Sequence, residues 1–382
     1  MHHDLIVFGE DWGGLPSSTQ HLIQHLAQTR KVIWVNSIGL RRPRLTLRDL
    51  QRLCRKLLPS QADNTKEMPL RCTANSNFYI INPRTLPAPR SALGRWTAVQ
   101  LLIAQIKPVV KKAQLHAPIL WTSLPTAVDM AGQLNESGVV YYCGDDFAGL
   151  AGVDHHTVSQ REQELHAKAD LIIASSALLA KRSAASRTQL LTHGVDYALF
   201  STPAARAPDL PDDGRNIAGF YGSISQWLHL DLLQQTIARM PDWHFLFIGK
   251  AVIDITCLTR FKNVTLLGER AHHQLPAYSQ HWTASLLPFI DNAQIRACNP
   301  LKFSEYLAAG RPIISTSFPA VADLQRAGIV QVADNNRAMV EALRASEHLS
   351  ALPAFAPLLR KQVSKNSWAA RAGQVADWLE KL

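Results

Sequence analysis

A lysine and a glutamate stand three residues apart at the start of a predicted helix, where an anionic ligand can bind. Lys302 and Glu305 belong to the segment 299–314, which reads as a helix followed by an apolar strand. Pro300 suits the first turn of this helix, and Gly310 suits its C-terminal cap. A lysine beside a helix N-terminus binds phosphate, and a carboxylate one turn further along accepts hydrogen bonds from a ribose diol. The pattern therefore predicts a pocket for a nucleoside diphosphate.

Two adjacent carboxylates, Asp145 and Asp146, follow the apolar run 139–142. Active sites of α/β proteins form where strands end, so one of these carboxylates could take a proton from an acceptor hydroxyl if burial raised its pKa. The alternative is structural, since an aspartate at this place also caps the next helix. Adjacent aspartates do not have the Asp-x-Asp spacing of a metal-binding transferase site.

Glycines mark two further turns at which a ligand can approach the backbone. Gly13 and Gly14 lie between the first strand and the first helix, and Gly222 with Ser223 follows the strand expected at 217–221. Gly222 and Ser223 offer a backbone N–H and a hydroxyl as donors. The first turn is neither a Gly-x-Gly-x-x-Gly nor a Walker A sequence, and it also fits an ordinary strand–helix connection.

Apolar runs alternate with helical stretches along the chain, which predicts an α/β fold with parallel sheets. The expected strands are 5–8, 32–35, 78–81, 119–121, 139–142 and 171–174, then 217–221, 245–248, 264–266, 284–287 and 312–315. The Pro-, Ala- and Asp-rich stretch 200–214 reads as a linker. A chain of 382 residues then forms two Rossmann-like, doubly wound domains that face a cleft.

The composition points to a globular protein of a reducing compartment. Hydrophobic residues make up 47% of the chain, and its five cysteines include no Cys-x-x-Cys pair, which argues against disulfides and structural zinc. Adjacent histidines diverge on a helix, so no metal site is expected. We expect a cytoplasmic protein with neither a signal peptide nor a membrane span, because the most apolar helical stretch, 101–110, is short and contains Gln105 and Lys107.

The net charge of +10 is concentrated partly in the segment 41–58. Its leucines recur at steps of three and four among seven basic residues, which predicts a basic amphipathic helix. This helix either packs on the N-terminal domain or docks to anionic lipid headgroups at the inner membrane face, each basic side chain contributing roughly 1 kcal/mol. Nucleic-acid binding is not expected, since aromatic residues are not interleaved with the charges.

The segment 299–314 also resembles the sugar-nucleotide motif of two-domain (GT-B) glycosyltransferases, particularly the group 1/family 4-like enzymes of bacterial polysaccharide assembly. Glu305 matches the second of two family glutamates, and Ala297 stands where the first, which contacts the donor sugar, would be. Many relatives grip the diphosphate with an Arg and a Lys where this chain has Ser223 and Leu228. The resemblance therefore leaves Lys302 as the principal charge for phosphate.

The resemblance implies transfer of a sugar from a nucleotide-diphosphate donor to a hydroxyl acceptor, plausibly a lipid-linked saccharide, without a metal or other cofactor. Similarity to the inverting glucuronosyltransferase of xanthan assembly places Asp145 as the base, with Asp146 as the near alternative. The same similarity assigns Glu269 to the nucleotide. In the family the loop that corresponds to Gly13 and Gly14 lines the cleft. His193 belongs to a hinge element of the form His-Gly-Val-Asp, and in this position it could contact the donor.

The expected division is an acceptor-binding domain at 1–203 and a nucleotide-sugar domain at 204–359, with a terminal helix, 360–382, that packs back on the first domain as in the family. Two other functions stay open. One is a nucleotide-sugar epimerase of the same fold, which would turn over the donor alone. The other is a non-catalytic sugar-nucleotide-binding protein, because the first family glutamate and both cations are missing.

Overall fold

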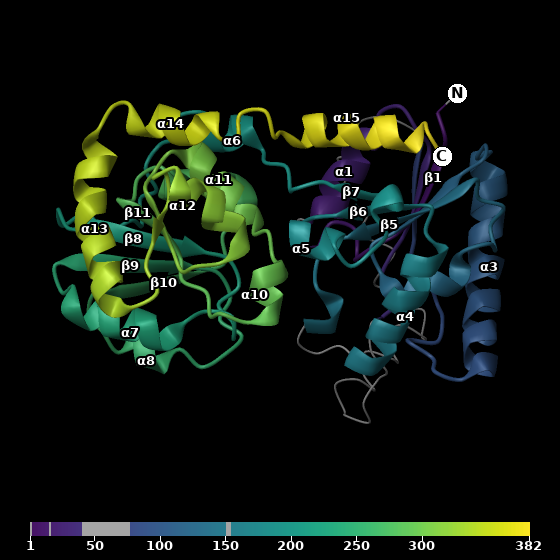
Figure 1. Ribbon diagram of the computed structural model, residues 1–382, viewed down its shortest axis with the longest axis horizontal. Helices are drawn as coiled ribbons and strands as arrows, with labels where there is room; N and C mark the ends of the chain where they lie inside the picture. Colours follow the sequence, from purple (N-terminus) through teal and green to yellow (C-terminus); the bar gives the residue numbers. More distant parts are fainter. Residues whose placement is uncertain (1, 15–16, 40–76, 150–153) are drawn as a thin grey trace. The chain divides into compact units, whose positions relative to one another are not determined.

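The computed structural model describes residues 2–14, 17–39, 77–149 and 154–382, which form two compact units (Figure 1). The first unit comprises Met1–Thr192 and Arg371–Leu382, and the second comprises His193–Ala370. Each unit contains one parallel sheet with helices between successive strands, so the predicted α/β architecture with two parallel sheets is confirmed. The basic segment 41–58 lies outside the described residues.

The first unit is a seven-stranded sheet in the order β3-β2-β1-β4-β5-β6-β7. Its strands are β1 (Leu5–Phe8), β2 (Val32–Val35), β3 (Phe78–Ile81), β4 (Ile119–Thr122), β5 (Gly138–Cys143), β6 (Leu171–Ala174) and β7 (Thr188–Leu190), and its helices are α1 (Ser18–Leu26), α3 (Ala92–Ala113), α4 (His155–Lys168), α5 (Ala177–Ala180) and the 3-10 helices η2 (Pro125–Met130), η3 (Phe147–Gly149) and η4 (Ala185–Arg187). The central strands β1, β2 and β4 are buried at every position, and apolar apart from Thr122, because helices cover both faces of the sheet. The strand order reverses between β1 and β4, which is where such sheets bind ligands.

The second unit is a six-stranded sheet in the order β10-β9-β8-β11-β12-β13. Its strands are β8 (Asn216–Tyr221), β9 (Trp243–Ile248), β10 (Val264–Gly268), β11 (Ala284–Leu287), β12 (Ile313–Ser315) and β13 (Gln331–Val332), and its helices are α6 (Tyr197–Ser201), α7 (Leu230–Arg239), α8 (Thr256–Thr259), α9 (Pro276–Ser279), α10 (Ala293–Ala297), α11 (Leu301–Ala309), α12 (Ala322–Arg326), α13 (Asn336–Ala351), α14 (Phe355–Lys361) and the 3-10 helices η5 (His272–Gln274) and η6 (Pro319–Val321). Here the order reverses between β8 and β11.

Two details differ from the sequence prediction. Pro300 is the N-cap of α11 and has extended backbone, with φ −69° and ψ 127°, rather than lying within the first turn. The terminal stretch is two helices, α14 and α15 (Trp368–Leu379), instead of one. The break has a local cause, because the Val195 N–H donates to the Asn366 carbonyl at 2.9 Å and Val195 forms a parallel bridge with Ser367, which requires extended chain there.

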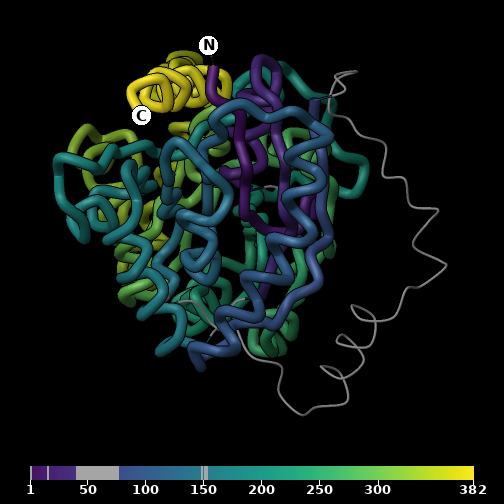
Figure 2. The backbone as a smooth tube through the Cα atoms, turned by 90° about the vertical axis from the view of Figure 1, so that its right-hand side faces the viewer, coloured from purple at the N-terminus to yellow at the C-terminus, as the bar shows by residue number. Residues whose placement is uncertain are grey.

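The two ends of the chain meet in the first unit. The Arg30 guanidinium, whose side chain is only 1% exposed, donates to Glu380, just after α15, at 2.6 Å, and His2 bonds to the same carboxylate. Figures 1 and 2 accordingly show the C-terminus beside the N-terminus. A buried arginine that lost this carboxylate would be an uncompensated charge, so the last residues of the sequence stabilise the first unit.

Candidate functional site

The ammonium group of Lys302 lies in the second unit at the turn after β8. Its Nζ lies 4.5 Å from the centre of the Phe220 ring and 5.7 Å from that of Phe289. A Cβ on Gly222, whose φ is +125°, would stand 2.5 Å from this Nζ, so only glycine leaves room for the lysine here. Burial lowers the pKa of Lys302 to about 8. Among the described residues no hydrogen bond or ion pair to the ammonium is found, which leaves it available to an anionic ligand.

The N-terminus of α11 adds to this positive environment. Pro300 occupies the N-cap position, and no side chain caps the helix. The first N–H groups of a helix have no partner within it, and together with the helix dipole they attract anions. Lys302 is the second residue of the helix, so its side chain and these N–H groups can act on the same phosphate.

Glu305, one turn further along α11, is held by two side chains of the same unit. The Tyr221 hydroxyl donates to its Oε2 at 2.7 Å, and His272 Nε2 lies 2.7 Å from its Oε1. Hydrogen bonding to Glu305 raises the pKa of His272 despite the partial burial of the ring. The glutamate expected to bind ribose is therefore fixed in orientation by Tyr221 and by His272.

A cavity of about 550 Å³ opens at the carboxyl ends of β11, β12 and β13. Phe289, whose ring lies near Lys302, is one of its walls. The others are His229, Asp291, Arg296, Thr316, Ser317, Phe318, Pro319, Ala322 and Asp334. Arg296 forms an exposed bidentate ion pair with Asp291, whereas the neighbouring Ala297 is 1% exposed. The cavity thus combines aromatic walls with charged and hydroxyl groups, as ligand pockets do.

In the first unit, the two carboxylates after β5 differ sharply. Asp146 is buried, and Arg182 donates two hydrogen bonds to it at 2.8 and 2.7 Å. Asp145 is exposed, and no described side chain is found bonded to it. The surrounding protein and the charge of Asp146 nevertheless raise the pKa of Asp145. Of the two, Asp145 is the carboxylate free to accept a proton.

A third carboxylate near this edge, Glu10, was missed by the sequence analysis. It follows β1, is half-buried, and accepts hydrogen bonds from the Ser17 hydroxyl and, at 3.3 Å, from Gln20. Burial raises the pKa of Glu10, and the negative charge of Asp145 raises it further. The only sequence signal was the position of Glu10 at the end of a central strand.

The remaining predicted residues lie in loops of one unit or the other. Gly13 has φ +75°, and its N–H donates to Gln20 at 3.1 Å; Gly14 is exposed beside it. Ser223 and Glu269 are exposed in the second unit, and His193 is half-buried there. The structure brings Gly222, Lys302 and Glu305 together in the second unit and Asp145 and Asp146 together in the first.

The described residues contain neither a cluster of metal ligands nor a membrane-spanning helix. No group of three or more His, Cys, Asp or Glu side chains is placed to hold a metal ion in this part of the chain. None of the described helices combines the length and the apolar character needed to cross a bilayer.

Comparisons of the sequence identify relatives of this chain. Residues 215–346 match the family model described as "Glycosyl transferases group 1". The Bacillus subtilis (strain 168) protein TuaH, named as a teichuronic acid biosynthesis glycosyltransferase, is 28% identical over 228 residues. These residues cover 54% of this chain and 57% of TuaH, so the match spans little more than half of either protein.

Solved structures extend the likeness in fold to the whole chain. Anabaena HepE in complex with UDP and glucose superposes with a TM-score of 0.68 at 14% identity, over 100% of both chains. Sucrose-phosphate synthase from Thermosynechococcus elongatus superposes with a TM-score of 0.69 at 15% identity, over 99% of this chain and 98% of that one. These neighbours are GT-B glycosyltransferases, and the likeness confirms the predicted fold.

Proposed function

We propose that this chain, whose residues 215–346 belong to the group 1 glycosyltransferases and whose fold is GT-B, transfers a sugar from a nucleotide-diphosphate donor to a hydroxyl acceptor. The observation that carries the proposal is the ammonium of Lys302 at the N-terminus of α11, next to Gly222, for which the described part of the chain shows no hydrogen bond or ion pair. A partly buried cation without a carboxylate partner costs stability, and a bound diphosphate would supply the missing charge. The crystallised HepE complexes contain UDP or UDP-glucose, which makes UDP the first nucleotide to test.

Lys302 would act on the leaving group. Negative charge develops on the diphosphate as the bond to the sugar breaks, and a preorganised cation with helix N–H groups stabilises that charge. Glu305 would hold the ribose hydroxyls with the oxygen lone pairs that Tyr221 and His272 leave free. Gly222 and Ser223 would supply further donors, and Glu269 and His193 remain candidates for contacts to the donor.

Asp145 would be the general base if the reaction inverts the sugar. Its carboxylate is exposed, whereas Asp146 is already bound by Arg182. A raised pKa makes a carboxylate a better proton acceptor. The proton of the acceptor hydroxyl would then pass to Asp145 as the new glycosidic bond forms. Gly13 and Gly14, in the loop after β1, would line the acceptor side.

The acceptor we propose is a lipid-linked saccharide at a membrane surface, with the protein bound peripherally on the cytoplasmic side. Support comes from the name of TuaH, which assigns it to teichuronic acid biosynthesis, and from the basic segment 41–58. The reaction would need no metal, because Lys302 and the helix N-terminus would stabilise the negative charge of the leaving diphosphate instead. An epimerase is less favoured, since the family match is to transferases.

The test is calorimetric binding of UDP, GDP, ADP and thymidine diphosphate to the wild type and to Lys302→Ala. We expect selective binding of one nucleotide, weakened in the variant by about 1.5–3 kcal/mol, the range for a charge-assisted contact. Lys262→Ala, an exposed lysine just before β10 at the opposite edge of the same sheet, is the matched control. Failure of all four nucleotides to bind would contradict the proposal, and turnover of the donor without acceptor would indicate the epimerase.

A further inference from the structure

The outward face of α3 carries apolar side chains where a surface helix normally carries charge. Ala98, Val99, Leu102 and Ile106 form its buried side. On the opposite side Leu93 is 73% exposed, Trp96 is 61% exposed and Leu101 is 42% exposed. Single exposed apolar residues are ordinary, but three within nine positions of one helix face, a tryptophan among them, form a patch.

The charges of α3 are of one sign only. The helix spans 22 residues and contains no Asp or Glu. With 3.6 residues per turn, Lys107, Lys111 and Lys112 continue the outward face beyond the apolar patch, and all three are exposed. The outer face therefore has an apolar half followed by a basic half.

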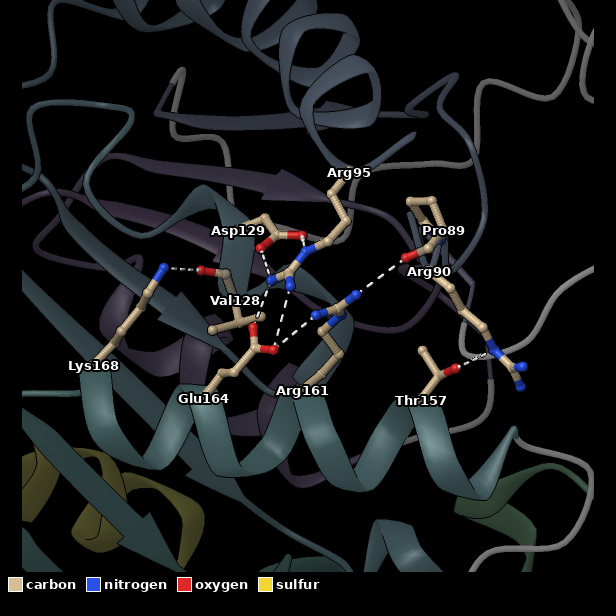
Figure 3. Close-up of polar contacts among 9 residues, drawn as sticks. All are labelled: Pro89, Arg90, Arg95, Val128, Asp129, Thr157, Arg161, Glu164 and Lys168. Atoms are coloured by element: carbon tan, nitrogen blue, oxygen red, sulfur yellow. Dashed lines mark hydrogen bonds and ion pairs between the residues drawn. The ribbon is translucent and has the colours of Figure 1, made fainter. Parts of the chain in front are cut away.

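The inner side of α3 is firmly held, which fixes the direction of the outer face. Arg95 points inward and forms ion pairs with Asp129 of η2 and with Glu164 of α4, and Arg161 donates to the same Glu164 (Figure 3). The Nε of Arg95 donates to Asp129 at 2.8 Å. These contacts pair Asp129 and Glu164 with arginines, so these two carboxylates do not neutralise the exposed lysines.

A loop widens the apolar part of this face. The Thr85 hydroxyl donates to the Ala98 carbonyl at 3.1 Å, and Gln105 bonds to both the N–H and the carbonyl of Arg84. These bonds hold the loop along one flank of α3. Leu86, at 44% exposure, is carried by it. We define the outer face of α3 together with Leu86 as the α3 face.

We propose that the α3 face lies on an anionic lipid bilayer. Helices that lie in the membrane interface combine Trp and Leu, which enter the headgroup–acyl boundary, with lysines that contact anionic headgroups. At about 1.5 Å per residue α3 is roughly 33 Å long, so its apolar and basic halves would both touch a flat surface. The proposal rests on the peripheral membrane association proposed above, for which it names the binding surface, and vesicle binding tests it separately from diphosphate binding and sugar transfer.

Charge decides against two other occupants. In a second copy, full overlap of the two faces would set lysines against lysines or against the apolar half, and overlap of the apolar halves alone would leave the lysines without an anionic partner. The segment 41–58 of this chain carries seven basic residues and no acidic one except Asp49, so it does not complement the lysines either. An anionic surface with an apolar interior satisfies both halves.

The experiment is co-sedimentation of the full chain with vesicles of phosphatidylcholine alone or with 30% phosphatidylglycerol. We expect the wild type to bind the anionic vesicles and to be released by salt. The double variant Leu93→Ser/Trp96→Ser and, separately, Lys107→Gln/Lys111→Gln should each lower the partition coefficient about tenfold. Because these side chains are exposed, melting temperature and diphosphate binding should not change.

Val252→Ser/Leu352→Ser is the control, since these side chains are 56% and 53% exposed in the second unit. It should bind vesicles as the wild type does. The proposal is overturned if the wild type does not bind anionic vesicles, or if both α3 variants bind like the wild type while neutralising the arginines of 41–58 abolishes binding. It is also overturned if the α3 variants change only the oligomeric state, measured by analytical ultracentrifugation, because the face would then join two copies.

Discussion

The charged groups at the carboxyl edges of the two sheets are satisfied in opposite ways. In the second unit the carboxylate of Glu305 is bonded by Tyr221 and His272, and the cation Lys302 has aromatic neighbours but no hydrogen-bonded or anionic partner among the described residues. In the first unit the cation Arg182 donates two hydrogen bonds to Asp146, and no described side chain is bonded to the exposed carboxylate of Asp145. An unpaired charge at the end of a strand is the group that awaits a ligand, so one edge suits an anion and the other suits a proton donor.

The largest expected effect separates the two aspartates. Asp145→Asn should lower the rate of sugar transfer by about 10²–10⁴-fold, the usual contribution of a general base, while donor binding stays as it is. Asp146→Asn should act mainly on stability, because it leaves the Arg182 guanidinium without its carboxylate. Single-turnover kinetics with thermal unfolding of each variant gives the comparison. Equal losses of rate in two equally stable variants would contradict the division of roles.

Lys302 should make diphosphate binding depend on pH. Its pKa in the free protein is about 8, so below pH 8 the ammonium is present and the affinity is full. Above pH 8 binding must take up a proton, and the affinity should fall by up to about tenfold per pH unit. Lys302→Arg, which stays charged, should flatten the profile between pH 7 and 10 when binding is followed by calorimetry. A wild-type profile that is flat over this range would remove Lys302 from the phosphate site.

The same lysine should cost the ligand-free protein some stability. Its pKa falls from 10.5 to about 8 on folding, so the charged form disfavours folding at pH values below 8, and this cost fades as the pH rises from 8 to 10.5. Lys302→Met should therefore raise the free energy of unfolding by about 1–2 kcal/mol at pH 7 and by much less at pH 10. Urea unfolding at the two pH values measures it. A destabilised variant at pH 7 would mean that the ammonium is paired in solution.

The sequence was sufficient for the parts of the molecule that local pattern determines. Every expected strand formed. Most of them are apolar runs with nearly every position buried, whereas β3 and β10 are apolar but partly exposed. Two strands were not predicted: β7 (Thr188–Leu190) is half-exposed and mixed in character, and β13 (Gln331–Val332) is too short to show a pattern. Gly310 was correctly placed as the C-cap, with φ +84°.

Tertiary contacts decided what the pattern could not. His272 lies thirty-three residues from Glu305, and no sequence pattern around either residue predicts that they pair. Arg182 reaches Asp146 from the turn after α5, so the sequence could not tell which of two adjacent aspartates would be bound. Sequence reasoning found the candidate groups in both units, and only the fold showed which charges were already paired.

The smallest effect concerns that His272–Glu305 pair. The pKa of His272 is raised on folding, so the pair contributes stability that is complete below pH 6.5 and is lost as the pH rises through the raised value. Glu305→Gln should therefore cost more at pH 5.5 than at pH 9, by less than about 1 kcal/mol because the pair is partly exposed. Tyr221→Phe removes the other bond to Glu305 without removing a charge, so its cost should be the same at both pH values. If urea unfolding showed the same loss of stability for Glu305→Gln at pH 5.5 and at pH 9, His272 would be neutral in the folded protein. Glu305 would then lack the positively charged partner that His272 provides, as Asp145 lacks a bonded one among the described residues.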